Sequence, residues 1–115
     1  MFPFEKLDVY NKAFALQRKV MVYLSDNKSL PVYIRNQYGR ANLSIMLNLA
    51  EGSGRSTNKD RKNFFIIARG SVFECVAIID LLLAQNEVDL EFHNELKSSY
   101  EEISRMIFAM IKNLS

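Results

Sequence analysis

Residues 48–60 read NLAEGSGRSTNKD, and the way this stretch interrupts the surrounding apolar pattern decides the fold. Apolar residues recur at helical spacing before it, and the same period resumes after it. Gly52 and Gly54 are expected to end the helix that precedes them, because glycine accepts the left-handed conformation that closes a helix. Thr57 followed by Asp60 resembles a capping box, which predicts that the next helix starts there. The stretch is therefore predicted to be a short turn between two long helices.

The rest of the chain predicts two further helices, one on each side of this pair. We expect helices over about residues 5–25 and 32–51, with Pro31 suited to the first turn of the second. The third runs to about residue 85, and the fourth is capped by Asp89 and extends to Leu114. No segment alternates with a period of two, so no sheet is expected. The prediction is an all-α, antiparallel up-down-up-down four-helix bundle, with residues 1–115 as one domain.

The composition of the chain bears on where this bundle is located and whether it has partners. Hydrophobic residues make up 49% of the chain, which is rich for a small monomer and leaves apolar surface for partners. The single Cys75 cannot form an internal disulfide, which suits a reducing cytoplasm. We expect no secretory signal, and charges interrupt every apolar stretch before about 18 residues, so no membrane span is expected. These features predict a cytoplasmic protein that does not enter a membrane.

Charge is spread unevenly along the chain, although the net charge is only +2. Residues 35–69 contain seven basic and two acidic residues, whereas residues 70–115 contain three basic and eight acidic residues. A concentration of positive charge of this kind favours an acidic partner such as nucleic acid, although charge runs are also common on solvated faces.

A polar stripe is expected within the apolar face of the second helix. At about 100° per residue, five polar residues share one narrow sector with apolar residues on both sides: Gln37, Arg40, Ser44, Asn48 and Glu51. The solvent side is then expected at Arg35, Asn42 and Met46. In the third helix, Gly70 is expected to allow a close approach of the second helix.

Carboxylates near a core need cations or several hydrogen-bond donors, because an unpaired buried charge is costly. Ser71 and Glu74 of the third helix also fall among apolar residues. We therefore predict a structural polar network that fixes the register of the second and third helices: Arg40, Ser44, Asn48, Glu51, Ser71 and Glu74.

The chain is poor in residues that carry catalysis. A di-iron bundle needs Glu-x-x-His pairs, but Leu90 stands three residues before the single His93, which is expected at the edge of an apolar face. Cys75 is predicted to be a small core residue, and no phosphate-binding glycine loop is present. A proton shared by Glu51 and Glu74 is the remaining catalytic alternative. We predict a non-enzymatic protein without metal, cofactor or small-molecule substrate.

Residues 37–74 resemble the central motif of a family of small bacterial four-helix-bundle proteins, the 23S rRNA intervening-sequence proteins. The matching positions are Gln37, Arg40-Ala41, Ser44-Ile45, Asn48-Leu49-Ala50-Glu51-Gly52, Gly54-Arg55 and Ala68-Arg69-Gly70-Ser71 with Glu74, where Leu49 replaces the family's usual isoleucine. The resemblance implies a left-handed bundle that assembles as a ring, commonly a homopentamer. A related, strongly basic branch comprises accessory proteins of diversity-generating retroelements, which bind nucleic acid.

Two functions follow as alternatives. The first is binding of RNA, or of other nucleic acid such as DNA, through a basic region around the turn between the second and third helices: Arg35, Arg40, Arg55, Lys59, Arg61, Lys62 and Arg69. The second is a protein-interaction or scaffold subunit without a nucleic-acid partner. Both use a homo-oligomer, in which a modest patch on each subunit is multiplied.

Overall fold

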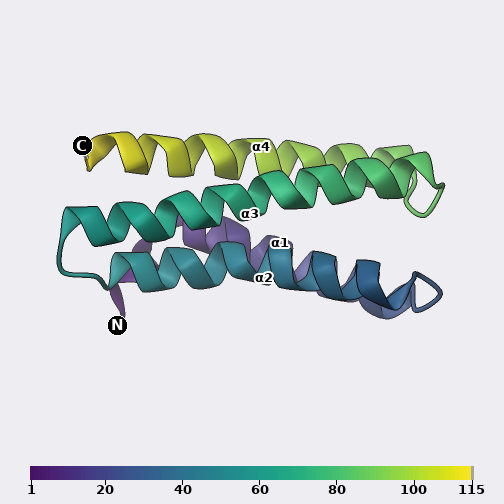
Figure 1. Cartoon of the computed structure of the whole chain (residues 1–115), viewed down its shortest axis with the longest axis horizontal. Coiled ribbons are helices and arrows are strands. Elements are labelled where there is room, and N and C mark those ends of the chain that lie inside the picture. Colours follow the sequence, from purple (N-terminus) through teal and green to yellow (C-terminus); the bar gives the residue numbers. More distant parts are fainter. Residues whose placement is uncertain (115) are drawn as a thin grey trace.

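Four antiparallel helices joined by short turns form the molecule, as Figure 1 shows. The computed structural model describes residues 1–114. A 3-10 helix, η1 (Pro3–Lys6), precedes α1 (Asp8–Asp26), α2 (Val32–Ser53), α3 (Asn58–Ala84) and α4 (Leu90–Asn113). The rod measures 43 × 23 × 21 Å along its principal axes. The expected all-α four-helix bundle is confirmed, and no strand occurs in residues 1–114.

Side-chain caps mark where α3 and α4 begin. Thr57 Oγ1 accepts a hydrogen bond of 3.1 Å from the N–H of Asp60, and Asp89 Oδ1 accepts one of 2.7 Å from the N–H of Phe92. After α3, Asn86 adopts the left-handed region with φ 58°. The sequence predicts both of these helix starts. Each capping side chain satisfies an N–H group that has no partner within the helix.

Gly54 caps the C-terminus of α2, as expected, but the left-handed conformation that the sequence predicts there is wrong. Gly54 has φ −92°, and no described glycine has a positive φ. Gly52 lies inside the helix and is buried, and a Cβ added there would lie 2.7 Å from the Phe65 ring and 2.9 Å from Phe64 Cβ. The close approach expected at Gly70 is also wrong, because a Cβ at Gly70 would meet nothing within 4 Å. The close contact between α2 and α3 is therefore at Gly52, near the turn.

A buried polar cluster joins all four helices at the centre of the core. Asn42 Nδ2 donates to Gln17 Oε1 at 2.7 Å, and Asn42 Oδ1 accepts from the Tyr100 hydroxyl at 2.5 Å and from Cys75 Sγ at 3.8 Å. The Tyr38 hydroxyl lies 2.9 Å from that of Tyr100 and donates to it, because the Tyr100 hydrogen is already directed at Asn42. Burial raises the pKa of both tyrosines, so both hydroxyls stay neutral donors.

Asn42 therefore corrects the expected orientation of α2. The sequence places it on the solvent side, but only 1% of its surface is exposed, and the buried face of α2 is Tyr38, Ala41, Asn42, Ile45, Leu49 and Gly52. Gln37, Arg40 and Glu51 are exposed instead. Leu43 and Leu47 make the polar stripe look internal in the sequence, but they are themselves 38% and 51% exposed.

Candidate nucleic-acid interface

Three of the six predicted network residues meet where α2 faces α3. Ser71 Oγ donates to Ser44 Oγ at 2.9 Å. Asn48 Nδ2 lies 2.9 Å from both the carbonyl oxygen and Oγ of Ser44. These contacts link the two helices at one level of the bundle, and Ser71 is the buried member of the set. All of these contacts are hydrogen bonds among hydroxyl, amide and carbonyl groups, and no charged side chain takes part in them.

The other three members lie outside this cluster. Glu51 is exposed and pairs with Arg55 at 2.8 Å, while Glu74 accepts a hydrogen bond of 3.0 Å from Gln37. Arg40 is exposed and forms no ion pair with residues 1–114. Gln37 lies nearly four turns before Glu51 on α2, so about 20 Å separates the levels of the two carboxylates. A proton shared between Glu51 and Glu74 is therefore ruled out by the packing.

Four of the seven predicted nucleic-acid contacts gather at one end of the rod, around the turn from α2 to α3: Arg55, Lys59, Arg61 and Lys62. The Arg55 guanidinium lies 4.6 Å from the centroid of the Phe64 ring, in addition to its pair with Glu51. Arg61 Nε donates to the carbonyl of Arg55 at 2.7 Å. Lys59 is exposed beside them. Contacts made by Arg55 and Arg61 therefore stabilise the turn.

The remaining three predicted contacts are spread along the molecule. Arg35 lies near the start of α2 at the opposite end, where its Nε donates to the carbonyl of Leu30 at 3.3 Å. Arg40 lies midway along α2. Arg69 lies in α3 with its guanidinium 5.0 Å from the ring centroids of both Phe73 and Phe108. The structure therefore does not bring all seven cations into one surface.

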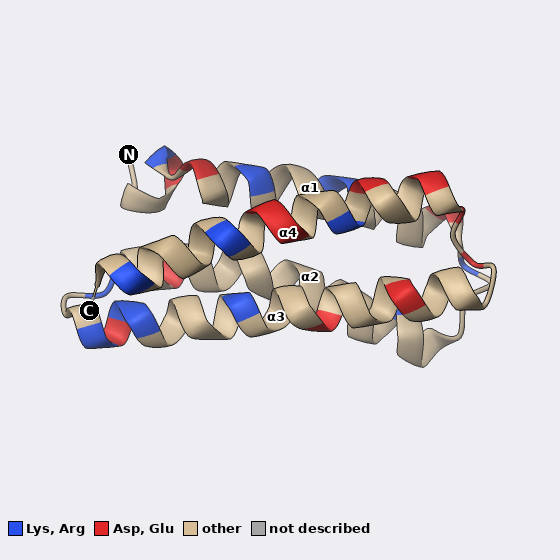
Figure 2. Ribbon diagram, turned by 90° about the horizontal axis from the view of Figure 1, so that it is seen from above, with Lys and Arg blue, Asp and Glu red and all other residues tan. Residues whose placement is uncertain are grey.

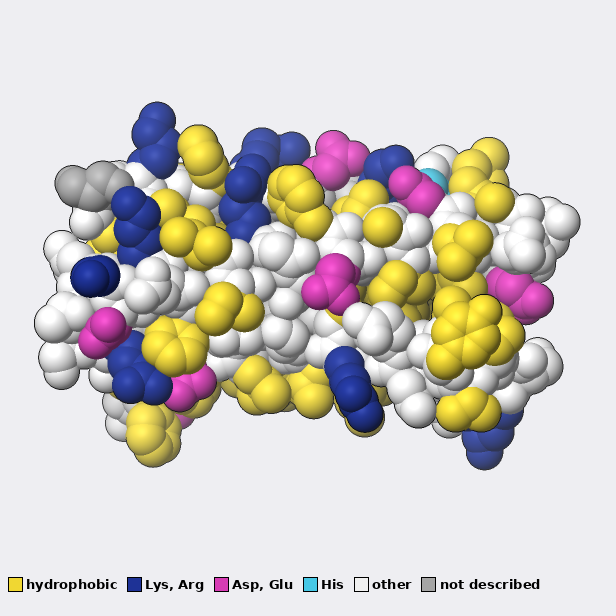
Figure 3. Space-filling model, in the orientation of Figure 1, with side chains coloured by type: hydrophobic (Ala, Val, Ile, Leu, Met, Phe, Trp, Pro, Cys, Tyr) yellow, Lys and Arg dark blue, Asp and Glu magenta, His cyan; other side chains and the backbone are white. Residues whose placement is uncertain are grey.

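Two cations of α4 were not among the predicted contacts, and only one of them lies near the basic end. Lys112 belongs to the last turn of α4, which antiparallel packing places beside the first turns of α3 (Figure 2), whereas Arg105 lies farther along the bundle, beside Val72, Phe73 and Val76. Lys112 Nζ lies 5.7 Å from the centroid of Phe108, the ring that also faces Arg69. Figure 3 shows Lys and Arg side chains toward this end, with hydrophobic side chains exposed among them. Both belong to residues 70–115, whose net charge is negative, so the charge pattern of the sequence did not indicate them.

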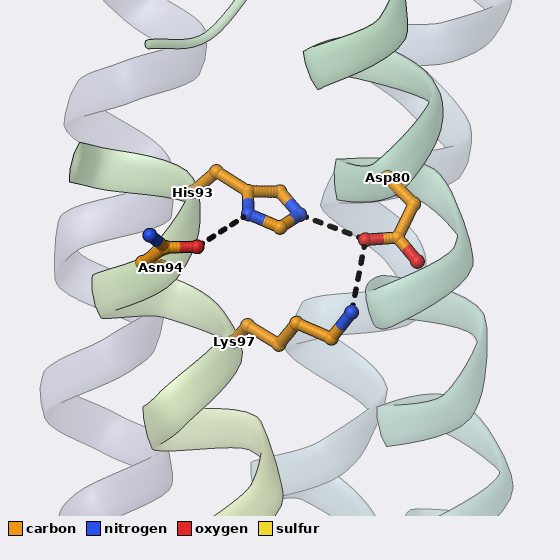
Figure 4. Close-up of polar contacts among 4 residues, drawn as sticks. All are labelled: Asp80, His93, Asn94 and Lys97. Carbon is orange, nitrogen blue, oxygen red and sulfur yellow. Dashed lines mark hydrogen bonds and ion pairs between the residues drawn. The ribbon is translucent and has the colours of Figure 1, made fainter. Parts of the chain in front are cut away.

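A second polar cluster joins α3 to α4 near the other end (Figure 4). His93 is buried, which corrects its expected place at a boundary, and its Nε2 lies 2.7 Å from Asp80 Oδ1. Lys97 Nζ lies 3.4 Å from the same oxygen, and His93 Nδ1 lies 3.2 Å from Asn94 Oδ1. The hydrogen bond to His93 lowers the pKa of Asp80, and Lys97 adds to this effect.

Cys75 is buried against Asn42, and burial raises the pKa of its thiol to about 12. A thiol of this kind is a poor nucleophile, because the thiolate is the reactive form. No group of three or more His, Cys, Asp or Glu residues in the described part of the chain could hold a metal ion. Likewise, none of the described helices is long and apolar enough to cross a membrane.

The fold and this surface define a small antiparallel four-helix-bundle protein with a basic end. Residues 5–109 match the model of the family described as 23S rRNA-intervening sequence protein, and the chain belongs to that family. A crystal structure from Bacteroides thetaiotaomicron, of a protein of unknown function from the S23 ribosomal protein family, is similar with a TM-score of 0.84. It is 20% identical over 90% of this chain and 98% of that one, which shows the shared fold alone. No curated protein matches the chain.

Proposed function

We propose that this chain is a non-enzymatic, homo-oligomeric bundle that binds RNA through its basic end. The observation that carries the proposal is the gathering of Arg55, Lys59, Arg61 and Lys62 around one turn, with Lys112 of α4 near the same end. Phosphate contacts from such a patch give affinity that depends steeply on salt and little on sequence. Several copies in one oligomer would multiply the patch, so weak binding by each subunit suffices.

Lys59 provides the sharpest test, because it is exposed and forms no hydrogen bond or ion pair within residues 1–114 that removing its charge would break. We expect Lys59→Gln to weaken binding of a fluorescent RNA at low salt and to reduce the salt slope by about one unit for each phosphate that the protein no longer neutralises. Lys28→Gln is the matched control, since Lys28 is exposed in the turn between α1 and α2 at the opposite end. Equal effects of the two substitutions, or affinity that does not change with salt, would contradict the proposal.

A specific observation also favours the alternative, a scaffold whose partner is a protein. Leu43, Leu47, Ile67 and Leu81 are exposed on the neighbouring outer faces of α2 and α3, at 38 to 51%. An apolar surface of this kind is suited to contact between protein chains. Solution mass by light scattering, with and without bulk RNA at low and high salt, separates the two functions. A discrete oligomer whose mass increases with RNA only at low salt supports RNA binding, whereas an oligomer indifferent to RNA supports the scaffold.

A further inference from the structure

The seam between α3 and α4 carries exposed aromatic rings next to cations, away from the α2–α3 turn. Phe73 of α3 and Phe108 of α4 are 57% and 47% exposed. The guanidinium of Arg69 lies over both rings, 5.0 Å from each ring centroid. Because one face of each ring meets the cation, the guanidinium holds both rings in place while much of their surface remains in solvent.

The guanidinium of Arg69 is not neutralised within the molecule. Neither Arg69 nor Arg105 forms an ion pair with residues 1–114, and Arg69 Nε is buried without a hydrogen-bond partner. Residues 61–73 of α3 and 103–114 of α4 include five basic residues and no acidic one, and Glu74 and Glu101 lie just outside these ranges. These segments lie side by side in the bundle (Figure 2). The seam therefore has positive charge and aromatic surface together, which an ordinary apolar interface lacks.

Two adjoining hollows open along this seam, and Phe73 lines both. The larger has a volume of about 340 Å³, with Val72, Val76 and Tyr100 as apolar lining and Glu101, Ser104 and Arg105 as polar groups. The smaller, of about 220 Å³, lies over Gly70 beside Ile66, Arg69 and Ile111. Gly70 weakens the helix by up to about 1 kcal/mol relative to alanine and relieves no contact inside the chain. Its lack of a side chain instead deepens this hollow.

From this geometry we infer that the α3–α4 seam is a binding site for single-stranded RNA, in which a base stacks on Phe73 and the adjacent phosphates meet Arg69 and Arg105. The inference rests on the proposed RNA binding and adds the strand state and the contacts. A hollow of about 340 Å³ is large enough for a base. Glu101 and Ser104 offer an acceptor and a hydroxyl at its rim for the edge of that base. Aromatic stacking with basic flanks is how proteins hold unpaired strands, whereas a paired strand does not expose its base faces.

The test compares variants of Phe73 in the full-length protein. Phe73 is exposed, so its truncation leaves the buried core intact. We expect Phe73→Ala and Phe73→Leu to weaken binding of a fluorescent single-stranded oligoribonucleotide of about 12 nucleotides by about fivefold or more, and Phe73→Tyr to keep it. Tyr33→Ala is the matched control, because Tyr33 is an exposed aromatic residue near the start of α2, at the other end of the rod. Ultraviolet cross-linking of the bound oligonucleotide should mark the peptide that contains Phe73.

Several outcomes would overturn the inference. Wild-type affinity in Phe73→Leu would show that apolar contact suffices without stacking. Equal affinity for a duplex of the same length would show that paired strands are bound. Competition by free mononucleotide at an equal nucleotide concentration would make the ligand a nucleotide and not a strand. A change in solution mass on Phe73→Ala without RNA would make the seam an interface between copies of the chain.

The same experiment separates this inference from the proposed function. If Lys59→Gln weakens binding and Phe73→Ala does not, RNA binds at the basic end and the seam is excluded. If Phe73→Ala weakens binding and Lys59→Gln does not, RNA binds at the seam, and the proposed binding through the α2–α3 turn is contradicted. If the wild-type protein binds no RNA at low salt, both the proposed function and the inference about the seam are contradicted.

Discussion

At the scale of single residues, Asn42 is the side chain on which the centre of the bundle depends. Its amide contacts Gln17 of α1, Cys75 of α3 and Tyr100 of α4 while standing on α2. Only 1% of its surface is exposed, so water cannot replace a missing partner. Buried polar groups without partners cost about 1–3 kcal/mol each, which makes this cluster a strong constraint on how the helices align.

Asn42→Ala should lower the free energy of unfolding by about 2–4 kcal/mol, because it leaves a cavity and deprives Tyr100 of its acceptor. Chemical denaturation followed by circular dichroism measures this. Asn36→Ala on the exposed side of the same helix is the control and should change stability by about 0.5 kcal/mol or less. A similar small change at both positions would mean that the buried cluster contributes little.

Asp80 supplies a stabilisation that depends on pH. Its hydrogen bond to His93 holds the folded-state pKa of Asp80 below the ordinary 3.8, so the carboxylate stabilises the fold above that value. This contribution disappears as the pH falls through the lower, folded-state pKa. Asp80→Asn should therefore be less stable than wild type at about pH 5, and the difference should shrink toward about pH 2. Denaturation at both pH values measures it, with exposed Asp26→Asn as the control, and a difference independent of pH would contradict the pairing.

At the scale of elements, the contact between α2 and α3 is decided near their shared turn. Gly52 is the point at which α2 packs directly on the buried Phe65, while farther along Ser44 and Ser71 bridge the same two helices. Gly52 and Gly70 therefore differ in role: Gly52 permits a close approach between helices, and Gly70 opens a hollow on the surface.

These two glycines form a matched pair for substitution. Gly52→Ala should destabilise the protein by about 1–3 kcal/mol, because its Cβ would lie 2.7 Å from the Phe65 ring, which is buried and cannot move aside. Gly70→Ala meets nothing within 4 Å and should stabilise α3 by up to about 1 kcal/mol. Melting temperatures of both variants should move in opposite directions, and a loss of stability at Gly70 would contradict this account.

At the scale of the whole molecule, the basic end and the exposed aliphatic faces of the helices overlap only in part. Cations gather at the end with the α2–α3 turn, and exposed leucines and isoleucines lie on the outer faces of α2 and α3 (Figure 3). With this arrangement, the assembly and the RNA binding that we propose would use different surfaces. The proposed oligomer and the proposed RNA binding thus use different residues and can be removed independently.

Leu47→Ser combined with Ile67→Ser should reduce the solution mass, because both side chains are about half exposed and supply apolar area for assembly. Light scattering at micromolar concentration measures the mass, and circular dichroism shows that the fold persists. Leu90→Ser, at the exposed start of α4, should leave the mass unchanged. An unchanged mass in the double variant would place any assembly surface elsewhere.

The number, order and approximate ends of the helices follow from the sequence alone, because period, capping residues and turn residues act over a few positions. Thr57, Asp89 and Asn86 mark helix ends through contacts with their immediate neighbours. The cluster of Arg55, Lys59 and Arg61 is equally readable, since the residues adjoin one turn. Gly54 also marks the end of α2, although it caps the helix without the left-handed conformation.

Which face of α2 is buried was decided only by the tertiary structure. A leucine reads the same in sequence whether it lies in a core or on an outer face, so Leu43 and Leu47 made the polar stripe appear internal and Asn42 external. In the seam, Arg69 contacts Phe108, and in the buried cluster Asn42 contacts Tyr100, in both cases across tens of residues. Such contacts depend on how the helices rotate and slide against one another, and the packing of the whole bundle sets both.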